Sequence, residues 1–397
     1  MLTLGHDRKT QEPVTLDASH ARVVLICGKR GSGKSYTLGV LAEELFAQQP
    51  RPMLLLVDPM GIFWTMAQRG ETPRGSGLRA VGSGQLPRAL NPEPGAESGL
   101  PVTVLVPGEP TGRYPQPFLT HLQTLGAHVQ RISFPPAALS SDAWCGLFEL
   151  SINEPLGIAL TRAITHLTEH QPAYALADLT EAIQHDALSQ DRTKEALLNR
   201  LSMAQTWSVF EPHAPLLDEL LTAETLNVLD LSTLDYSTHG LRSLVLALLA
   251  QQLFRARHVV RQTAEPDSPQ PKCWLLIDEA HQFIPQGQST LAKDALIRWV
   301  KEGRQPGLSC VLASQQPGSL DQDVLSQCDA LIAHKLTNLE DVTALNRLSQ
   351  AYMGSELKVY LRHLTGPGQA VLVDDARERV TMLHVRERLT RHGGGEA

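Results

Sequence analysis

Long hydrophobic runs are missing from this sequence of 397 residues. The longest uninterrupted apolar stretch, LVLALLA, covers only residues 244–250, whereas a helix needs about 20 apolar residues to cross a bilayer. We therefore expect no transmembrane helix and no membrane partner. The first residues, MLTLGHDRKTQ, lack an apolar stretch behind a basic one, so the sequence predicts no secretory signal and a cytoplasmic location.

Clustered cysteines and an excess of positive charge are missing as well. No two of the cysteines have C-x-x-C spacing, and three lie in or beside apolar, strand-like runs, which favours reduced, buried thiols. The five are Cys27, Cys145, Cys273, Cys310 and Cys328. The formal net charge of -7 argues against a broad basic face that coats nucleic acid or an anionic membrane. A narrow basic channel is still compatible with this charge.

A glycine-rich motif, GKRGSGKS, is present at residues 28–35. It fits the phosphate-loop pattern G-x-x-x-x-G-K-[ST], whose backbone amides surround phosphates. An apolar strand-like run precedes the motif and a helical pattern follows it, as the pattern requires. Lys34 should hold the β- and γ-phosphates, and the hydroxyl of Ser35 should bind magnesium. The sequence therefore predicts ATP and Mg²⁺ as cofactors, with ATP contacts from Gly28, Lys29, Arg30, Gly31, Ser32, Gly33, Lys34, Ser35 and Tyr36.

The apolar run WLLID at residues 274–278 ends in an acid, Asp278, and a second acid, Glu279, comes next. Asp278 is placed to hold magnesium through water, and Glu279 to polarise the water that attacks the γ-phosphate. The alternative, in which Asp278 caps a helix, loses weight because a phosphate loop lies upstream.

Two further polar residues follow strand-like runs. Asp58 ends MLLLVD and could support the attacking water, because acids at strand ends point into the crevice where ligands bind. It could equally cap a turn before Pro59. Gln315 follows SCVLAS and could sense the γ-phosphate, or it could form a turn before Pro317.

Arg304 and Arg22 are candidate arginine fingers that reach the nucleotide of a neighbouring subunit. Arg304 ends a helical pattern in KEGRQPGL, so it could instead interact with the helix dipole. Arg22 precedes the first core strand and could be an ordinary surface arginine.

Strand-like and helical segments alternate along the chain, which predicts an α/β fold with a mostly parallel sheet and helices on both faces. We predict an N-terminal hairpin (1–20), a core in two parts (21–138 and 226–386), a helical insertion (139–225) and a C-terminal tail (387–397). Within the insertion, HLTEH at 166–170 fits the inverted zinc-protease pattern. Pro172 follows it and no partner acid is evident, so we interpret it as a solvated helix end.

The motifs together resemble the HerA-type ATPases, relatives of FtsK-like DNA translocases in the RecA-like part of the P-loop class. The resemblance rests on GKRGSGKS, VDPMG, NVLDLS, LLIDEAHQFIP, KEGRQPGLSCVLASQQP and GPGQAVLV. It implies a RecA-like P-loop core and a hexameric ring that moves on double-stranded DNA while ATP is hydrolysed between subunits. Arg304 matches the family's arginine in its GR-x-x-G motif, Arg22 matches a basic residue upstream of the phosphate loop, and Asp58 and Gln315 match positions near the attacking water.

The resemblance also bears on partners. Only about 20 residues precede the first core strand, so the N-terminal β-barrel with which many relatives dock a nuclease is not expected here. Some relatives without the barrel work with effector proteins in anti-phage defence, so the resemblance implies a nuclease or defence effector as partner. An ATP-dependent assembly scaffold and a conjugation- or secretion-type ATPase are the alternative functions.

A sequence-independent motor should contact DNA mainly through its phosphates. The candidate cations, each of which could instead be a solvated surface charge, are Arg69, Arg74, Arg79, Lys293, Arg298 and Lys301.

Overall fold

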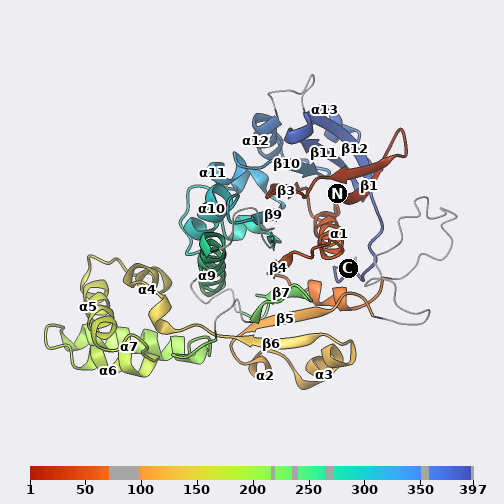
Figure 1. Cartoon of the computed structure of the whole chain (residues 1–397). Helices are drawn as coiled ribbons and strands as arrows, with labels where there is room; N and C mark the ends of the chain where they lie inside the picture. Colours follow the sequence, from red (N-terminus) through yellow and green to blue (C-terminus); the bar gives the residue numbers. More distant parts are fainter. Residues whose placement is uncertain (71–97, 216–219, 235–239, 264–271, 350–356, 395–397) are drawn as a thin grey trace.

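A single mixed sheet is the centre of the molecule (Figure 1). The computed structural model describes residues 1–70, 98–215, 220–234, 240–263, 272–349 and 357–394. Within them the strand order is β2-β1-β12-β11-β10-β3-β9-β8-β4-β7-β5-β6. Neighbouring strands from β10 to β6 are parallel, and those from β2 to β10 are antiparallel. The predicted α/β class with a mostly parallel sheet is therefore confirmed.

Most of the parallel strands are apolar because both of their faces are covered, whereas the edge strand β6, HVQRI, is polar and partly exposed. In sheet order they are β10 (Ala330–Ala333), β3 (Val23–Cys27), β9 (Leu308–Ser314), β8 (Cys273–Ile277), β4 (Met53–Asp58), β7 (Leu226–Asp230), β5 (Val102–Pro107) and β6 (His128–Ile132). The antiparallel strands are β1 (Leu2–Asp7), β2 (Pro13–Leu16), β11 (Gln369–Asp374) and β12 (Arg379–Val385). The N-terminal hairpin, β1 and β2, extends the sheet by pairing with β12.

Alternate side chains of each buried strand point to opposite faces of the sheet. In β3, Val24 and Ile26 pack into the core shared with helix α1 (Lys34–Phe46), whereas Leu25 and Cys27 pack into the core on the other face. The helices of this second face include α9 (Leu241–Thr263), α10 (Lys293–Glu302), α12 (Leu339–Ser349) and α13 (Leu357–Arg362). The short α11 (Gln322–Leu325) joins them, while α2 (Pro110–Arg113) and α3 (Gln116–Thr124) lie beside β5 and β6.

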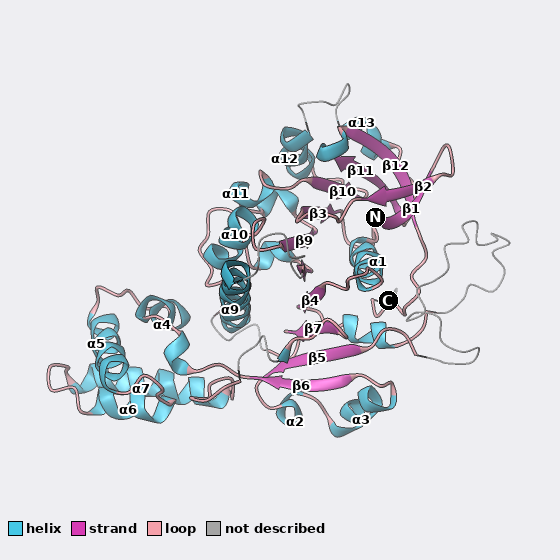
Figure 2. Ribbon diagram, in the orientation of Figure 1, coloured by secondary structure: helices cyan, strands magenta, loops and turns pink. Residues whose placement is uncertain are grey.

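Four helices form a lobe that projects from the sheet (Figures 1 and 2). They are α4 (Ser141–Leu147), α5 (Pro155–His170), α6 (Leu176–Gln184) and α7 (Asp191–Thr206). The chain enters and leaves the lobe at one place, where the amide of Phe134 donates to the carbonyl of Val209 at 2.8 Å and the amide of Glu211 donates back to Phe134 at 2.9 Å. The lobe contains helices where the sequence predicts a helical insertion; the exact domain boundaries stay a prediction.

The C-terminal segment packs on the core. Residues 387–394, in the predicted C-terminal tail, contact α1 and the segment after β4. The fully buried carboxylate of Glu43 on α1 accepts hydrogen bonds from the amides of Leu389 and Thr390 at 2.9–3.2 Å and from the Thr390 hydroxyl at 2.7 Å. Arg386 adds an ion pair to Glu43 at 2.7 Å. The end of β12 is therefore fixed to the helix that begins at the phosphate loop.

Candidate functional site

The phosphate loop lies between β3 and α1, at the carboxyl edge of the parallel strands. Gly31 and Gly33 have φ values of 73° and 107°, which glycine adopts without steric cost. Gly33 is the N-cap of α1, and the amides of Gly33, Lys34 and Ser35 have no partner among the described residues. Free amides at a helix N-terminus are a site for anions. The loop thus fits the phosphates that the sequence predicts for it.

Lys34 is buried beside this loop, with its ammonium 3.4 Å from the carbonyl of Lys29. Burial lowers the pKa of Lys34, while the nearby carboxylates of Glu279 and Asp278 act in the opposite direction. Because burial has already removed water from the Lys34 ammonium, an anionic phosphate would stabilise its charge strongly. The position of Lys34 therefore matches its predicted role as a phosphate ligand.

Ser35 and Asp278 meet at the start of α1 and the end of β8. The Ser35 hydroxyl donates to Oδ2 of Asp278 at 2.9 Å. Burial and the like charge of Glu279 raise the pKa of Asp278 to about 6. A hydroxyl and a carboxylate are hard oxygen ligands of the kind magnesium prefers, and a nearby divalent cation would relieve the cost of burying the Asp278 charge. The residues present therefore fit Mg²⁺, which Ser35 and Asp278 would hold.

Glu279 and Gln315 are brought together from two neighbouring strand ends. The Gln315 side-chain amide donates to Oε1 of Glu279, while Oε2 of Glu279 is buried without a hydrogen-bond partner. Glu279 has a left-handed backbone, with φ at 49°, a conformation that non-glycine residues adopt at a cost. A buried carboxylate oxygen left free beside the phosphate loop is available to accept a proton from water.

His281, which sequence reasoning did not single out, is part of the same cluster. Its Nδ1 lies 3.5 Å from Oε2 of Glu279 and 3.3 Å from the Ser314 hydroxyl. Burial lowers the pKa of His281. The neutral imidazole therefore flanks the Glu279 carboxylate without neutralising its charge.

Asp58 has a different geometry from the one that would support an attacking water. Its Oδ1 accepts the amides of Met60 and Gly61 at 3.1 and 2.8 Å, and its Oδ2 accepts the amide of Phe63 at 2.7 Å. Burial and the neighbouring Asp230 raise its pKa to about 8. This arrangement matches the alternative in which Asp58 caps the turn after β4.

The two candidate arginine fingers, Arg304 and Arg22, precede β9 and β3. They therefore lie at the amino edge of the parallel strands, opposite the carboxyl edge that carries the phosphate loop. Arg304 precedes β9, whose seven residues separate it from Gln315 by roughly 23 Å of extended strand. Its side chain is exposed and makes no ion pair in the described parts of the chain. Arg304 therefore lies far from its own phosphate loop, with its side chain exposed.

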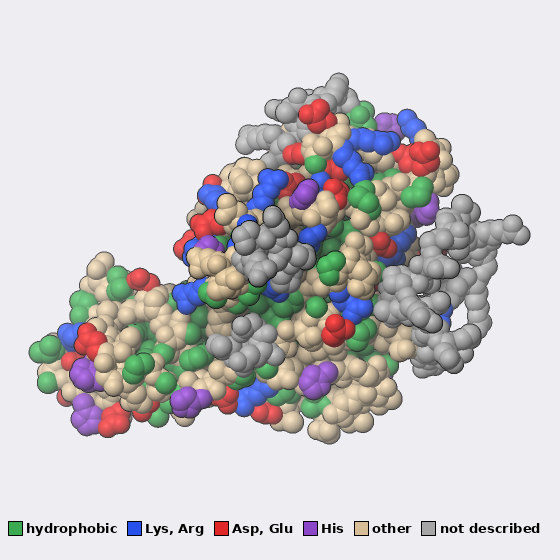
Figure 3. All heavy atoms as spheres, viewed as in Figure 1, with side chains coloured by type: hydrophobic (Ala, Val, Ile, Leu, Met, Phe, Trp, Pro, Cys, Tyr) green, Lys and Arg blue, Asp and Glu red, His purple; other side chains and the backbone are tan. Residues whose placement is uncertain are grey.

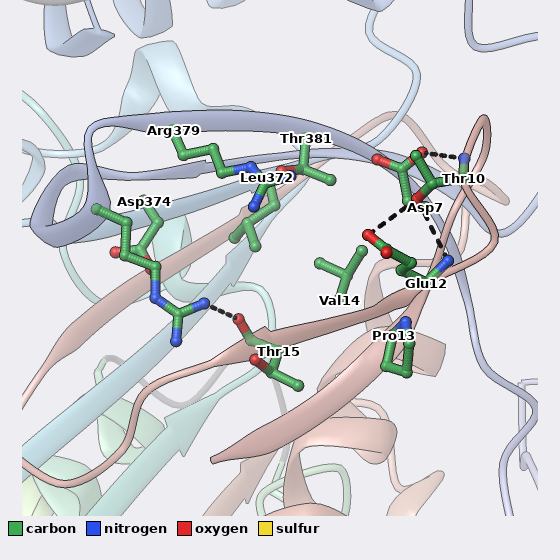
Figure 4. Close-up of a pocket in the computed structure, with 11 residues that line it drawn as sticks. Asp7, Thr10, Glu12, Pro13, Val14, Thr15, Leu372, Asp374, Arg379 and Thr381 are labelled. Carbon is green, nitrogen blue, oxygen red and sulfur yellow. Dashed lines mark hydrogen bonds and ion pairs between the residues drawn. The ribbon is translucent and has the colours of Figure 1, made fainter. Parts of the chain in front are cut away.

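Arg22 is not free in this way. Its guanidinium is buried and paired with Asp374 at 3.0 Å. Figure 4 shows Asp374 beside a small cavity of about 70 Å³ between the N-terminal hairpin and β11 and β12. That volume is far below the 300–1,000 Å³ of typical ligand sites. The arrangement favours a structural role for Arg22 over the expected finger, and it also differs from an ordinary surface arginine.

Tyr36 and the three predicted DNA-binding cations on α10 contact other side chains or the backbone of the same chain. The Tyr36 hydroxyl accepts the amide of Arg388 at 2.7 Å, so the side chain contacts the C-terminal segment next to the predicted ATP site. All three cations predicted on α10 are paired with carboxylates: Lys293 with Asp321 at 2.8 Å, Arg298 with Glu302 at 2.9 Å and Lys301 with Asp323 at 2.8 Å. The backbone of Arg69 pairs with that of Thr390 in an isolated β-bridge, which does not engage the Arg69 charge, and Arg74 and Arg79 lie outside the described residues.

His334 is a second residue that sequence reasoning missed. It follows β10, and its imidazole lies behind the phosphate loop, with Nδ1 2.9 Å from the Gln369 carbonyl and Nε2 2.9 Å from the Thr37 hydroxyl. A carbonyl only accepts, so Nδ1 donates and Nε2 accepts from Thr37. Burial lowers the pKa of His334 to about 4. The sequence signal that could have identified His334 was its position directly after an apolar, strand-like run, which the structure places beside the phosphate loop.

The histidine pattern at 166–170 has no metal geometry. His166 and His170 stack at the end of α5, with ring centroids 4.4 Å apart, and Nδ1 of His170 lies 2.8 Å from the His166 carbonyl. The described residues hold no group of three or more His, Cys, Asp or Glu side chains arranged for a metal ion. Nor does any helix in the described ranges have the length and apolarity needed to span a membrane.

Known proteins share parts of this sequence. The probable DNA double-strand break repair helicase HerA of Methanocaldococcus jannaschii is 38% identical over 102 residues, which are 26% of this chain and 20% of that protein. A probable helicase of the same organism is 32% identical over 121 residues, which are 30% of this chain and 23% of that protein. The matches span about a fifth of the length of these relatives.

The fold and the family follow from two further findings. VirB4 of Thermoanaerobacter pseudethanolicus superposes with a TM-score of 0.60 and 15% identity, covering 97% of this chain and 96% of that one, which shows a shared fold. With Lys34, Ser35, Asp278 and Glu279 assembled at one sheet edge, the site is that of a P-loop ATPase. The sequence profile of the family described as "Helicase HerA, central domain" matches residues 2–251, well over half of the chain. The chain therefore belongs to the HerA central-domain family.

Proposed function

We propose that this protein is a magnesium-dependent ATP hydrolase that works as a hexameric ring and moves on double-stranded DNA, together with a nuclease or defence effector. The observation that carries the proposal is the Glu279 carboxylate, buried next to the phosphate loop: Gln315 holds one oxygen, while Oε2 has no hydrogen-bond partner among the described residues and the His281 ring lies near it, at 3.5 Å. A buried acceptor without a partner is costly, and a water that attacks the γ-phosphate would satisfy it.

The residues divide the chemistry between them. Free amides at the start of α1 and the Lys34 ammonium bind the phosphates, and Glu279 accepts the proton of the attacking water. Bound magnesium would neutralise charge that develops on the transferred phosphoryl group. Gln315 orients Glu279 and lies where a γ-phosphate would change its hydrogen bonds. Each role needs only side chains that the fold already places at this edge.

Arg304 supports the assembly part of the proposal. It lies at the far edge of the sheet from its own phosphate loop, so it would act only on the nucleotide of another copy. Head-to-tail contact between copies that closes on itself produces a ring. Double-stranded DNA as the substrate rests on the family, in which relatives are named as DNA double-strand break repair helicases.

The first experiment measures ATP turnover by the purified protein with and without linear duplex DNA, with Lys34→Ala as the inactive control. Several-fold stimulation that weakens with added salt would support a DNA motor, because phosphate contacts are salt-dependent. Turnover that is indifferent to DNA would contradict it.

An ATP-dependent assembly scaffold is the second candidate. One observation favours it: the α10 cations expected to bind DNA are engaged by carboxylates of the same chain. Glu279→Gln separates the two functions. A motor should lose its biological activity with this substitution, whereas a scaffold should still assemble and support its effector. A secretion-type ATPase shares the fold, but the likeness to VirB4 shows the fold alone.

A further inference from the structure

A groove with a volume of about 330 Å³ lies between α12, α13 and the segment that follows β10. Its lining includes the neutral polar residues Thr337, Asn338 and Thr365 besides an apolar set and a cationic set. Apolar side chains form one part, namely Leu336, Leu339, Val342, Leu361 and Leu364, and cations form another, namely Lys335, Lys358 and Arg362. Leu339 is 65% exposed and therefore presents apolar surface to solvent in the same groove as the cations. The surface thus combines an apolar floor with positive charge.

The three cations differ from the other basic residues near the site. Lys335, Lys358 and Arg362 form no ion pair among the described residues, whereas all three α10 cations do. Unpaired cations around an apolar floor favour an occupant that brings both carboxylates and apolar side chains. A phosphate backbone would use the charges and leave the floor exposed.

The groove is joined to the nucleotide site by two hydrogen bonds. The carbonyl of Lys335 accepts the amide of Lys29 in the phosphate loop at 2.9 Å. Asp341 in the first turn of α12 accepts the amide of Gly318 at 2.9 Å, three residues after Gln315. An occupant that moved either wall would therefore act on the phosphate loop or on the segment next to Gln315.

The projecting lobe has the complementary surface. From residue 139 to 225 the sequence holds 13 Asp and Glu against 4 Lys and Arg, a charge of -9, although the whole chain carries only -7. Acidic side chains are visible on the lobe in Figure 3. Leu188, in the loop between α6 and α7, is 78% exposed, and the exposed acids Glu181, Asp191 and Glu195 belong to the same two helices. These acids form no ion pair in the described parts of the chain.

We propose that the α6–α7 end of the lobe of one copy docks into the α12–α13 groove of the next copy. Leu188 contacts the apolar floor, and Glu181, Asp191 and Glu195 face Lys335, Lys358 and Arg362. In Figure 1 the lobe helices lie at the lower left and α12 and α13 lie at the top, far from each other, so the contact joins two molecules. Such a contact is head-to-tail and therefore propagates around a ring. The inference rests on the proposed ring and names its contact surfaces.

A charge-swap experiment tests the contact in full-length protein. The groove variant is Lys358→Glu with Arg362→Glu, and the lobe variant is Asp191→Lys with Glu195→Lys. Arg255→Glu with Arg261→Glu on exposed α9 positions is the matched control. Assembly is measured by analytical ultracentrifugation with magnesium and a non-hydrolysable ATP analogue at 0.1 M salt, after circular dichroism has verified folding. A Leu188→Ser variant checks the apolar part without changing charge.

The expected result is a rise of about tenfold or more in the dissociation constant for each reversal, with no change for the control. Combining both reversals should restore assembly to within about threefold of wild type. Rings that survive each reversal, or a combination that assembles no better than a single reversal, would overturn the docking inference but leave the proposed motor intact. Weaker duplex binding with unchanged assembly would assign the groove to DNA instead. Wild-type protein that stays monomeric would overturn both the contact and the ring.

Discussion

The hydroxyl of Ser35 lies 2.9 Å from Oδ2 of Asp278 and joins the start of α1 to the end of β8. This contact brings together two motifs that are 243 residues apart in the sequence. It also sets the place where magnesium would be held, because both groups offer hard oxygen atoms. The first prediction follows from this pair.

Asp278→Asn should raise the magnesium concentration needed for half-maximal ATP turnover by about 10–100-fold, since asparagine lacks the charge that holds the metal's outer ligands. The measurement is a magnesium titration of ATP turnover at saturating ATP. Asp294→Asn, which changes an exposed acid on α10, is the control. An unchanged magnesium requirement in Asp278→Asn would remove this residue from the metal site.

Glu279→Gln should lower ATP turnover by about 10²–10⁴-fold, because the amide cannot accept a proton from the attacking water. Nucleotide binding should persist, since the phosphate loop is unaltered, and fluorescent ATP-analogue binding would report it. Gln315→Ala should cost less, because it leaves the base in place without its orienting partner. If Gln315→Ala cost as much as Glu279→Gln, the base assignment would move away from Glu279.

Arg304→Ala should abolish turnover when all subunits carry it, and mixing should rescue it. Subunits with Lys34→Ala lack a phosphate ligand but still present Arg304, whereas Arg304→Ala subunits have an intact phosphate loop. A mixture of the two inactive proteins should therefore form some complete sites and regain a measurable fraction of wild-type turnover. Mixtures that stay inactive, despite mixed assembly verified by native mass spectrometry, would contradict a finger that acts between subunits.

Much of this arrangement could be predicted from the sequence because its signals are local. Short apolar runs predict the buried strands. Residue spacing identifies the phosphate loop and the two acids, Asp278 and Glu279, at the end of the apolar run WLLI. The HerA-type resemblance and the α/β class are confirmed. Other features depend on distant partners: Arg22 is buried by Asp374, more than 350 residues away, and Lys301 is paired with Asp323 only after α10 and α11 pack. Local patterns cannot contain such pairings.

Acid should destabilise the protein through His334. Its folded-state pKa is about 4, against an ordinary value of 6.5. As the pH falls, the unfolded chain binds this proton first, so stability is complete above pH 6.5 and is lost progressively down to about pH 4. Linkage puts the loss at about 3 kcal/mol. His334→Gln keeps a donor and an acceptor but cannot titrate, so its urea midpoint should fall less between pH 6.5 and 4.5 than that of wild type.

The exposed His20 is the control for this experiment, because it makes no hydrogen bond in the described residues and His20→Gln should leave the pH dependence unchanged. Parallel pH dependence of the wild-type and His334→Gln midpoints would show that the imidazole is not held neutral. Comparing differences between proteins matters here because other buried acids titrate over the same range.

Glu43→Gln should destabilise the fold by about 3–5 kcal/mol. The substitution keeps the shape of the side chain but removes the charge that faces Arg386 and the buried Arg388, and breaking one side of a buried ion pair leaves the other charge uncompensated. The neighbouring Glu44→Gln is the matched control: its side chain is 20% exposed and also pairs with Arg386, so it should cost about 1 kcal/mol or less. Urea unfolding measures both values.

Limited trypsin digestion should release the C-terminal segment faster from Glu43→Gln, since three donors in residues 387–394 form their hydrogen bonds to this carboxylate. Equal effects of the two substitutions would mean that α1 holds the C-terminal segment by packing alone, and the segment would then have no charge-dependent connection to the phosphate-loop helix.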